Sequence, residues 1–198
     1  MLPLEPDKSR AVRPQTRKIP RASYVPEGRT LHLVDLENLV GGPFAPAEVM
    51  LASIDQFNRL AVRSLDDLVW VGTNPRLVLQ AKRLMPQARC LTKGGPDGAD
   101  LALLNELDNP TWIAERFDRV VIGSGDGIFS DVAREMRTLG VRVGVVARRG
   151  TVSLRLGYAV DFVRLFRPVW YPPRRGMKSS ANHPRYPQPI SRAKRACA

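Results

Sequence analysis

The chain of 198 residues has few of the side chains on which several classes of site depend. It contains two cysteines, Cys90 and Cys197, and two histidines, His32 and His183. The cysteines have neither a metal-binding spacing nor a pattern typical of a disulfide framework, so a reducing, cytoplasmic compartment is the simplest expectation. His32 lies in an apolar stretch, where we expect a core residue, and His183 lies near the C-terminus. A zinc site is therefore not expected.

Long apolar runs are also missing. No stretch approaches the roughly 20 apolar residues that a membrane-spanning helix needs. The first residues, MLPLEPDKSRAVRPQ, place prolines and charges where a secretory signal would have an apolar segment. The sequence also lacks a Walker A motif and a G-x-S-x-G nucleophile elbow. We expect a soluble protein without a membrane partner.

Basic charge is abundant, and it lies at the two ends of the chain. Of the formal net charge of +12, little belongs to residues 31–167, which carry 17 Lys or Arg against 16 Asp or Glu. Residues 1–30 carry 7 Lys or Arg against 3 Asp or Glu, and residues 168–198 carry 7 Lys or Arg and no Asp or Glu. Both ends are rich in proline and lack apolar periodicity, so we predict disordered arms at 1–29 and 168–198 around one domain at 30–167. Such arms either raise affinity for polyanions or act only as solubilising tails.

Strand-like and helix-like patterns alternate through the domain, which predicts an α/β fold with a mostly parallel sheet of five or six strands and helices on both faces. Ligand sites in such sheets lie outside the carboxyl ends of the strands. The predicted strands are 30–36, 67–72, 88–93, 119–124, 141–147 and 161–166, and the predicted helices are 46–62, 75–85, 100–107, 111–117, 131–140 and 153–159.

Three aspartates fall at this edge of the predicted sheet. Asp35 closes the first strand in LVDLEN, Asp100 opens the helix after the third strand in GGPDGAD, and Asp126 follows the fourth strand in GSGDGIF. Each alone could be a helix cap. Together they would repel one another unless a cation separated them, and a set of oxygen ligands suits Mg²⁺ or Mn²⁺. The spacing therefore favours a divalent metal site.

Other polar residues lie close to these aspartates in the sequence. Asn38 follows Asp35 by three residues, where its amide could orient a ligand or serve as a turn cap. Ser124 could orient a water or a ligand oxygen, or simply satisfy its turn. Glu106 could approach the metal from the second turn of its helix or lie on a solvated face. The glycines of GSGDGIF are expected to allow close backbone approach and positive φ, which would admit a metal or phosphate.

The motifs VDLENL, GADLALLNEL and GSGDGIF resemble the three signature regions of the NYN domain family, relatives of the PIN-domain ribonucleases. The resemblance spans about residues 30–166, with the motifs in the family's order. It implies a PIN-like, Rossmannoid three-layer sandwich and metal-dependent cleavage of RNA. Matched one by one, the family's site residues correspond to Asp35, Asn38, Asp100 and Asp126.

The sequence departs from the family's pattern at two positions. The third motif of the family usually reads S-G-D-x-D-F, and here Ile128 takes the second acidic position, so Asp131 is the residue that could compensate from the next helical turn. The second motif often carries a further Asp six residues after the first, and here that residue is Glu106. We accordingly count Glu106 and Asp131 as additional candidate metal ligands.

The leading hypothesis is a metal-dependent endoribonuclease that uses Mg²⁺ or Mn²⁺ to hydrolyse phosphodiesters of RNA. Asp35, Asp100 and Asp126 would hold the metal. Three arginines after the fifth strand and the serine of the third motif would contact the RNA, namely Arg148, Arg149, Arg155 and Ser124. Two alternatives stay open: a non-catalytic RNA-binding or adaptor protein on the same fold, and a small-nucleotide hydrolase or binder. A second copy of the chain or another protein partner is also left open.

Overall fold

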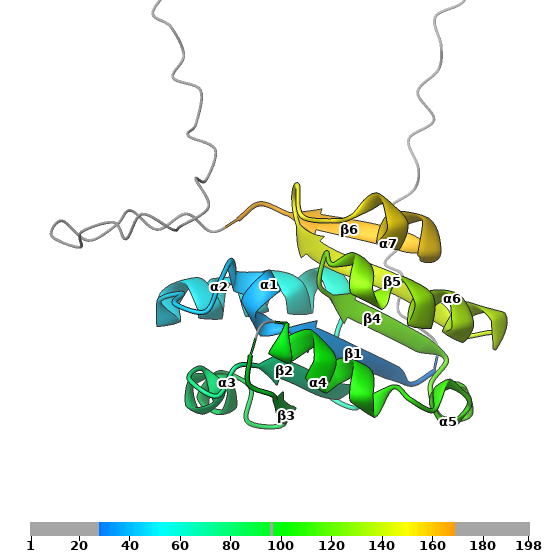
Figure 1. Ribbon diagram of the computed structural model, residues 1–198, viewed down its shortest axis with the longest axis horizontal. Coiled ribbons are helices and arrows are strands. Elements are labelled where there is room, and N and C mark those ends of the chain that lie inside the picture. The colour runs from blue at the N-terminus through cyan, green and yellow to red at the C-terminus, as the bar shows by residue number, and fades with distance from the viewer. Residues whose placement is uncertain (1–27, 96, 169–198) are drawn as a thin grey trace, which may run out of the picture.

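A computed structural model describes residues 28–95 and 97–168, which form one all-parallel sheet with helices on both faces (Figure 1). The six strands are arranged in the order β3-β2-β1-β4-β5-β6, which confirms the predicted α/β sandwich. The strand bounds are β1 Thr30–Asp35, β2 Leu68–Thr73, β3 Arg89–Thr92, β4 Arg119–Gly123, β5 Arg142–Arg148 and β6 Phe162–Phe166.

The helices divide between two apolar cores, one on each face of the sheet. Helices α1 to α3 contribute to one core, and α4 to α7 contribute to the other. The bounds are α1 Leu36–Val40, α2 Ala47–Ala61, α3 Val78–Leu84, α4 Gly98–Glu106, α5 Pro110–Ala114, α6 Ser130–Thr138 and α7 Leu154–Ala159, with a single 3₁₀ turn, η1, at Gly127–Phe129.

Strand β1 shows how the sequence produces these two cores. Leu31 and Leu33 belong to one core and Val34 to the other, because successive side chains of a strand point to opposite faces. His32 is fully buried and meets the Phe57 ring edge-on at a centroid distance of 5.8 Å. Burial lowers the pKa of His32, although its Nε2 lies 2.8 Å from the Asp67 carboxylate. His32 is therefore a core residue, as expected from the sequence.

The first strand ends one residue earlier than predicted, and a short helix follows directly. The Asp35 side chain accepts a hydrogen bond from the backbone N of Asn38 at 3.1 Å and so caps α1. The helix ends at Val40, and Gly41, with a φ of +96°, caps its C-terminus. A five-residue helix is too short to show an apolar period, so the sequence pattern did not reveal it.

The glycines of GSGDGIF allow other parts of the protein to approach the backbone closely; the expectation was a metal or phosphate in that place. None of Gly123, Gly125 and Gly127 is among the described glycines with positive φ, so that part of the expectation is corrected. A Cβ on Gly123 would lie 2.8 Å from the Phe57 ring, and one on Gly125 would lie 2.4 Å from the carbonyl oxygen of Thr151. These glycines are needed because the loop after β4 packs tightly against its neighbours.

The predicted arms lie outside the described residues, apart from Gly28, Arg29 and Pro168. Among the helices that the structure describes, none combines the length and apolar character required to cross a membrane.

Candidate functional site

The sheet brings the three predicted aspartates to the edge at which its strands end. Asp35 is the last residue of β1, and Asp126 follows the end of β4, the neighbour of β1 in the sheet. Asp100 lies in the first turn of α4, which packs against β1 and β2. Asp35 and Asp100 are buried, with 3% and 7% of their surface exposed, whereas Asp126 is exposed. The site thus has two buried carboxyl groups and a third at the surface.

The Asp35 carboxylate is held by three hydrogen-bond donors. Besides the Asn38 backbone N, the Ser124 hydroxyl donates to Oδ2 of Asp35 at 3.2 Å, and the carboxyl group of Asp100 donates as well. Burial raises the pKa of Asp35, and these hydrogen bonds oppose that effect. Asp35 is therefore the member of the Asp35–Asp100 pair best suited to carry negative charge.

Asp100 holds a proton at neutral pH. Burial, followed by the charge of Asp35 and the hydrogen bond to it, raises the pKa of Asp100 to about 8, and Asp126 adds a further increase. The other oxygen of Asp100, Oδ1, is buried and has no hydrogen-bond partner among the described residues. A buried oxygen without a partner, beside a charged carboxylate, is an arrangement that a cation would stabilise.

The donor set fits a hard divalent ion. Within residues 28–95 and 97–168, no three His, Cys, Asp or Glu side chains gather closely enough to hold a metal as they stand. Asp35 and Asp100 nevertheless provide two adjacent carboxyl groups, and Mg²⁺ is commonly bound by one or two carboxylates together with water and substrate phosphates. The unpartnered Oδ1 of Asp100 and the absence of nitrogen or sulfur donors from the pair favour Mg²⁺ or Mn²⁺ over Zn²⁺.

Asn38 and Ser124 hold the site together. The Asn38 side-chain Oδ1 accepts from the backbone N of Gly125 at 3.1 Å, and the backbone carbonyl oxygen of Asn38 accepts from Nε of Arg148 at 2.8 Å. Ser124 is fully buried and also accepts from the backbone N of Asp126 at 3.2 Å. The predicted contact of Ser124 with RNA is therefore corrected, because its hydroxyl braces the carboxylates and does not face solvent.

Asp126 is both a helix cap and a member of the carboxylate cluster, the two roles that its sequence context allowed. Its Oδ1 accepts from the backbone N of Ile128 at 3.0 Å, so it caps η1, and its charge also raises the pKa of Asp100. Ile128, two residues after Asp126, is 37% exposed.

The structure does not bring Glu106 and Asp131 to this site. Glu106 lies at the far end of α4 and forms an ion pair of 2.9 Å with Arg89, the first residue of β3, so it belongs to the opposite edge of the sheet. Asp131 is largely exposed and forms ion pairs with Arg134 and Arg155 at 2.7 and 2.5 Å. Glu106 lies six residues beyond Asp100, which is about 9 Å along the helix, and Asp131 is directed to Arg134 and Arg155. The ion pair with Asp131 also engages the guanidinium of Arg155.

The structure adds a contact at Glu37 that sequence reasoning missed. Its Oε1 accepts from the backbone N of Asn74 at 2.8 Å, and this bond joins α1 to the segment after β2. The charge of Glu37 also raises the pKa of Asp35. The sequence placed Glu37 two residues after Asp35 and so close to the candidate site. Its partner, Asn74, is shown only by the packing of α1 beside β2.

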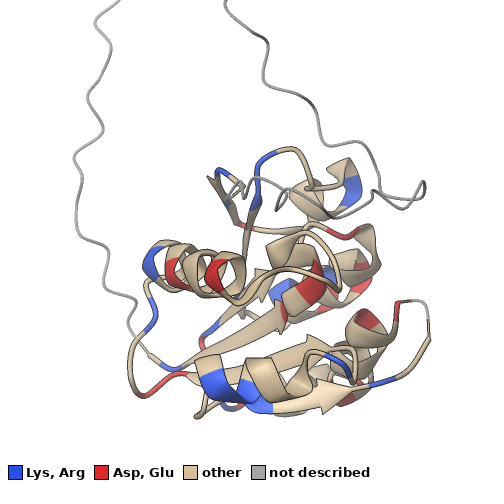
Figure 2. Ribbon diagram, turned by 90° about the vertical axis from the view of Figure 1, so that its left-hand side faces the viewer, with Lys and Arg blue, Asp and Glu red and all other residues tan. Residues whose placement is uncertain are grey.

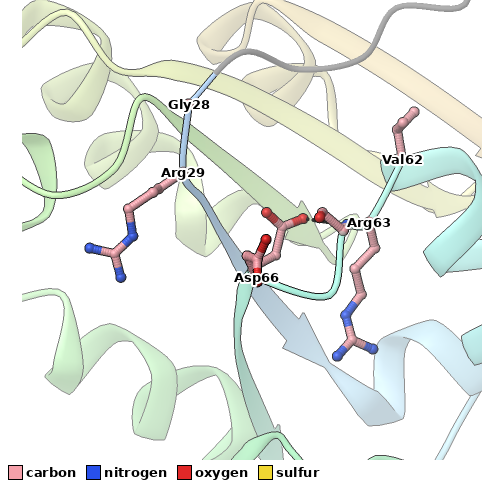
Figure 3. A pocket seen from close by; sticks show the side chains of 7 residues that line it. Gly28, Arg29, Val62, Arg63 and Asp66 are labelled. Atoms are coloured by element: carbon pink, nitrogen blue, oxygen red, sulfur yellow. Dashed lines mark hydrogen bonds between the residues drawn. The ribbon is translucent and has the colours of Figure 1, made fainter.

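A hollow of about 460 Å³ lies at the opposite edge of the sheet (Figure 3). The Arg29 and Arg63 side chains diverge from each other there, so they do not form a paired anion site. None of the predicted site residues contributes to its lining, which consists of Gly28, Arg29, Val62, Arg63, Ser64, Asp66 and Asp67. The candidate site is therefore the carboxylate cluster and not this hollow.

Comparisons with known proteins bear on the fold. No family model matches the sequence, and no curated protein matches it. A solved structure of a protein of unknown function from Vibrio parahaemolyticus is similar to this chain, with a TM-score of 0.50 and 19% sequence identity. The similarity covers 70% of this chain and 92% of that chain. It supports the α/β sandwich and, at this identity, carries nothing about activity.

Proposed function

We propose that this protein is a metal-dependent ribonuclease whose site is the carboxylate cluster at the carboxyl edge of the sheet. The observation that carries the proposal is the buried Asp35–Asp100 pair, in which one carboxyl must hold a proton and leaves an oxygen without a partner. Burying two carboxyl groups in contact is costly for stability. That cost has a functional explanation if a divalent cation replaces the shared proton.

In this proposal Asp35 and Asp100 hold the Mg²⁺ or Mn²⁺ ion. A divalent ion there would supply an activated water and would neutralise charge on the phosphodiester. Ser124 and Asn38 keep Asp35 and the loop after β4 in place. Asp126, exposed at the rim, is the carboxylate that meets solvent and substrate, where it can complete the ligand set or orient the attacking water.

RNA is the substrate class that the sequence supports best. The three motifs that resemble the NYN family carry Asp35, Asp100 and Asp126, and the structure places these residues at one edge. The basic ends of the chain add a general attraction for polyanions. We place Arg149, which is exposed after β5, among the residues that contact the RNA backbone.

An RNA cleavage assay with Mn²⁺, with and without chelator, tests the proposal. We expect cleavage by the full chain that the chelator abolishes. Asp35→Asn and Asp100→Asn should each reduce the rate at least about 100-fold, the order of effect expected when one group that stabilises transition-state charge is removed. Asp108→Asn is the matched control, because Asp108 is an exposed carboxylate just beyond α4 and away from the site.

Two results would contradict the proposal. The first is cleavage that persists in the chelator, since the site would then have no need of a metal. The second is equal activity in the Asp100→Asn and Asp108→Asn variants, which would assign any cleavage to a contaminant or to another site.

A non-catalytic RNA-binding protein is the second candidate. Ile128 replaces an acidic residue of the family motif, and the described side chains do not by themselves form a three-ligand metal cluster. Such a protein would bind RNA with a steep salt dependence and no metal requirement. Mn²⁺ titration by calorimetry, with and without Asp100→Asn, separates the two functions.

A further inference from the structure

Helix α1 joins the parts of the candidate site, but it has little to stabilise it from within. It is five residues long, and helices of this length are not stable alone. Asp35 caps its N-terminus, and its last turn contains no basic residue. The carbonyl oxygens of that turn need hydrogen-bond donors from elsewhere, and a positive charge is favourable there because it meets the negative end of the helix dipole.

Arg148, the last residue of β5, supplies such a donor. Val146 belongs to the apolar core that contains α1, and Arg148 points to the same face of the sheet because side chains two residues apart in a strand do so. Its Nε donates to the backbone carbonyl oxygen of Asn38 at 2.8 Å, in a partly buried hydrogen bond between residues 110 positions apart. A cation from a distant strand thus satisfies a carbonyl group in the last turn of α1.

Asn38, held in this way, connects the ends of two neighbouring strands. Its backbone N donates to Oδ1 of Asp35 at 3.1 Å, and its side-chain Oδ1 accepts from the backbone N of Gly125 at 3.1 Å. Gly125 directly precedes Asp126. A displacement of α1 would therefore move Asp35 and the loop of Asp126 relative to each other.

The segment after Arg148 is bound to the same loop. The carbonyl oxygen of Arg148 accepts from Oγ1 and from the backbone N of Thr151, at 2.9 and 3.2 Å. The backbone N of Ser153 donates to the carbonyl oxygen of Gly125 at 2.9 Å. Arg148 is thus the residue at which β5, α1 and the segment bound to the loop after β4 are joined.

The neighbouring Arg149 has a different environment. Its side chain is exposed, and its backbone N donates to the carbonyl oxygen of Phe166 in β6 at 2.8 Å. Figure 2 views the molecule from the side on which β6 ends and shows acidic and basic positions interspersed along the ribbon, so charge alone does not assign an arginine at this edge to RNA. The contacts of the two side chains separate them: Arg148 binds the protein, and Arg149 faces solvent.

From these contacts we infer that Arg148 is a positioning residue of the carboxylate site, which fixes α1 and, through Asn38, fixes Asp35 and the loop that carries Asp126. The inference rests on the proposed ribonuclease function and gives Arg148 a role in holding the metal ligands in place of the expected contact with RNA. Groups that orient metal ligands typically change metal affinity or activity by about 10- to 100-fold.

Three variants of the full chain test the inference. Arg148→Met removes the donor and the charge but keeps a long side chain, and Arg148→Lys keeps both. Arg164→Met is the matched control, because Arg164 is likewise half-buried and its Nη1 donates to a carbonyl oxygen in the last turn of a helix, that of Leu60 in α2. The measurements are amide hydrogen exchange of Asn38 and Gly125 by NMR, Mn²⁺ affinity by calorimetry, and kcat and KM for cleavage of a single-stranded RNA.

We expect Arg148→Met to speed the exchange of both amides and to weaken Mn²⁺ binding, each by at least about tenfold. It should lower kcat by a similar factor and change KM less than about twofold, because Arg148 acts on the metal ligands and not on the substrate. Arg148→Lys should recover most of each loss, and Arg164→Met should leave all of these quantities near those of the natural chain. Urea unfolding is measured for every variant, and Arg148→Gln takes the place of Arg148→Met if the latter does not fold.

The other outcomes overturn defined parts. A rise in KM with unchanged kcat and unchanged Mn²⁺ affinity would mean that Arg148 contacts the RNA, so the inference would be wrong while the ribonuclease proposal stood. Equal effects of Arg148→Met and Arg164→Met would leave Arg148 only a general part in stability, which also refutes the inference. If the natural chain neither binds Mn²⁺ nor cleaves RNA, the proposed function fails, and the amide exchange by itself decides whether Arg148 holds α1 and the loop after β4.

Discussion

Replacing Asp100 by Asn should stabilise the metal-free protein, and increasingly so as the pH rises. The amide donates to Asp35 in the place of the proton that the Asp100 carboxyl carries, and it has nearly the same shape. In the natural protein that proton is held with a pKa of about 8, against 3.8 for an ordinary Asp. Because the folded state binds this proton more tightly than the unfolded state, the stability that it contributes is fully present below pH 3.8 and declines as the pH rises toward 8.

The size of the effect follows from the displacement of the pKa. At about 1.4 kcal/mol per unit, the full displacement would amount to several kcal/mol. Water at the rim beside the exposed Asp126 screens the two carboxylates, so we expect about 2 kcal/mol between Asp100→Asn and the natural protein above pH 8. The difference should shrink toward zero at about pH 4, where Asp100 is protonated in both states.

Urea unfolding in the presence of a chelator, at pH values from about 4 to about 9, measures this difference. Asp108→Asn removes an equal charge from an exposed position and serves as the control, for which we expect a small change that does not follow the same pH profile. A stability difference for Asp100→Asn that is independent of pH would refute the reasoning, because Asp100 would then be ionised in the folded state at neutral pH.

Three further predictions use the same unfolding and binding measurements. Gly125→Ala should cost about 1–3 kcal/mol, since its Cβ would lie 2.4 Å from the Thr151 carbonyl oxygen. A Cβ on Gly157, within α7, would meet its nearest atom, on Val152, at 4.0 Å, so Gly157→Ala should leave stability unchanged or raise it; equal effects would show that the loop after β4 can move aside. Ile128→Asp adds a carboxylate two residues after Asp126 and should tighten Mn²⁺ binding in calorimetry, while Ile128→Asn tests for a change of polarity alone. Equal affinities in the two variants would show that position 128 does not reach the ion of the proposed site. Burial lowers the pKa of His32 from 6.5, so the unfolded chain binds a proton below pH 6.5 more readily than the folded state does. The protein should therefore lose stability as the pH falls below 6.5, and His32→Phe should reduce this loss. An unchanged pH profile of stability in His32→Phe would show that another group causes the loss.

Much of the architecture could be predicted because it follows from local patterns. The short apolar stretch with Leu31, Leu33 and Val34 predicts β1, and the order of strands and helices implies parallel pairing with crossovers on both faces. Helix α1 was missed because five residues are too few for a period; Asp35 caps its first turn, and Leu36, Leu39 and Val40 bury its apolar side. The metal candidates at Glu106 and Asp131 were proposed from motif spacing, but the ends and faces of α4 and α6 direct them to Arg89 and Arg155.

The sequence by itself determined the α/β class and the near-neutral domain with basic ends. It also determined that Asp35 and Asp126 lie at the ends of two strands and that Asp100 lies at the start of the helix after a third. Only the tertiary structure decided which of these aspartates share an environment: Asp35 and Asp100 are in contact and buried, while Asp126 stays at the surface. The physical reason is that burial and the separation of charges depend on segments distant in the sequence. A carboxyl group acquires a pKa of about 8 from the helix and the strand packed around it, and the order of residues does not encode that environment locally.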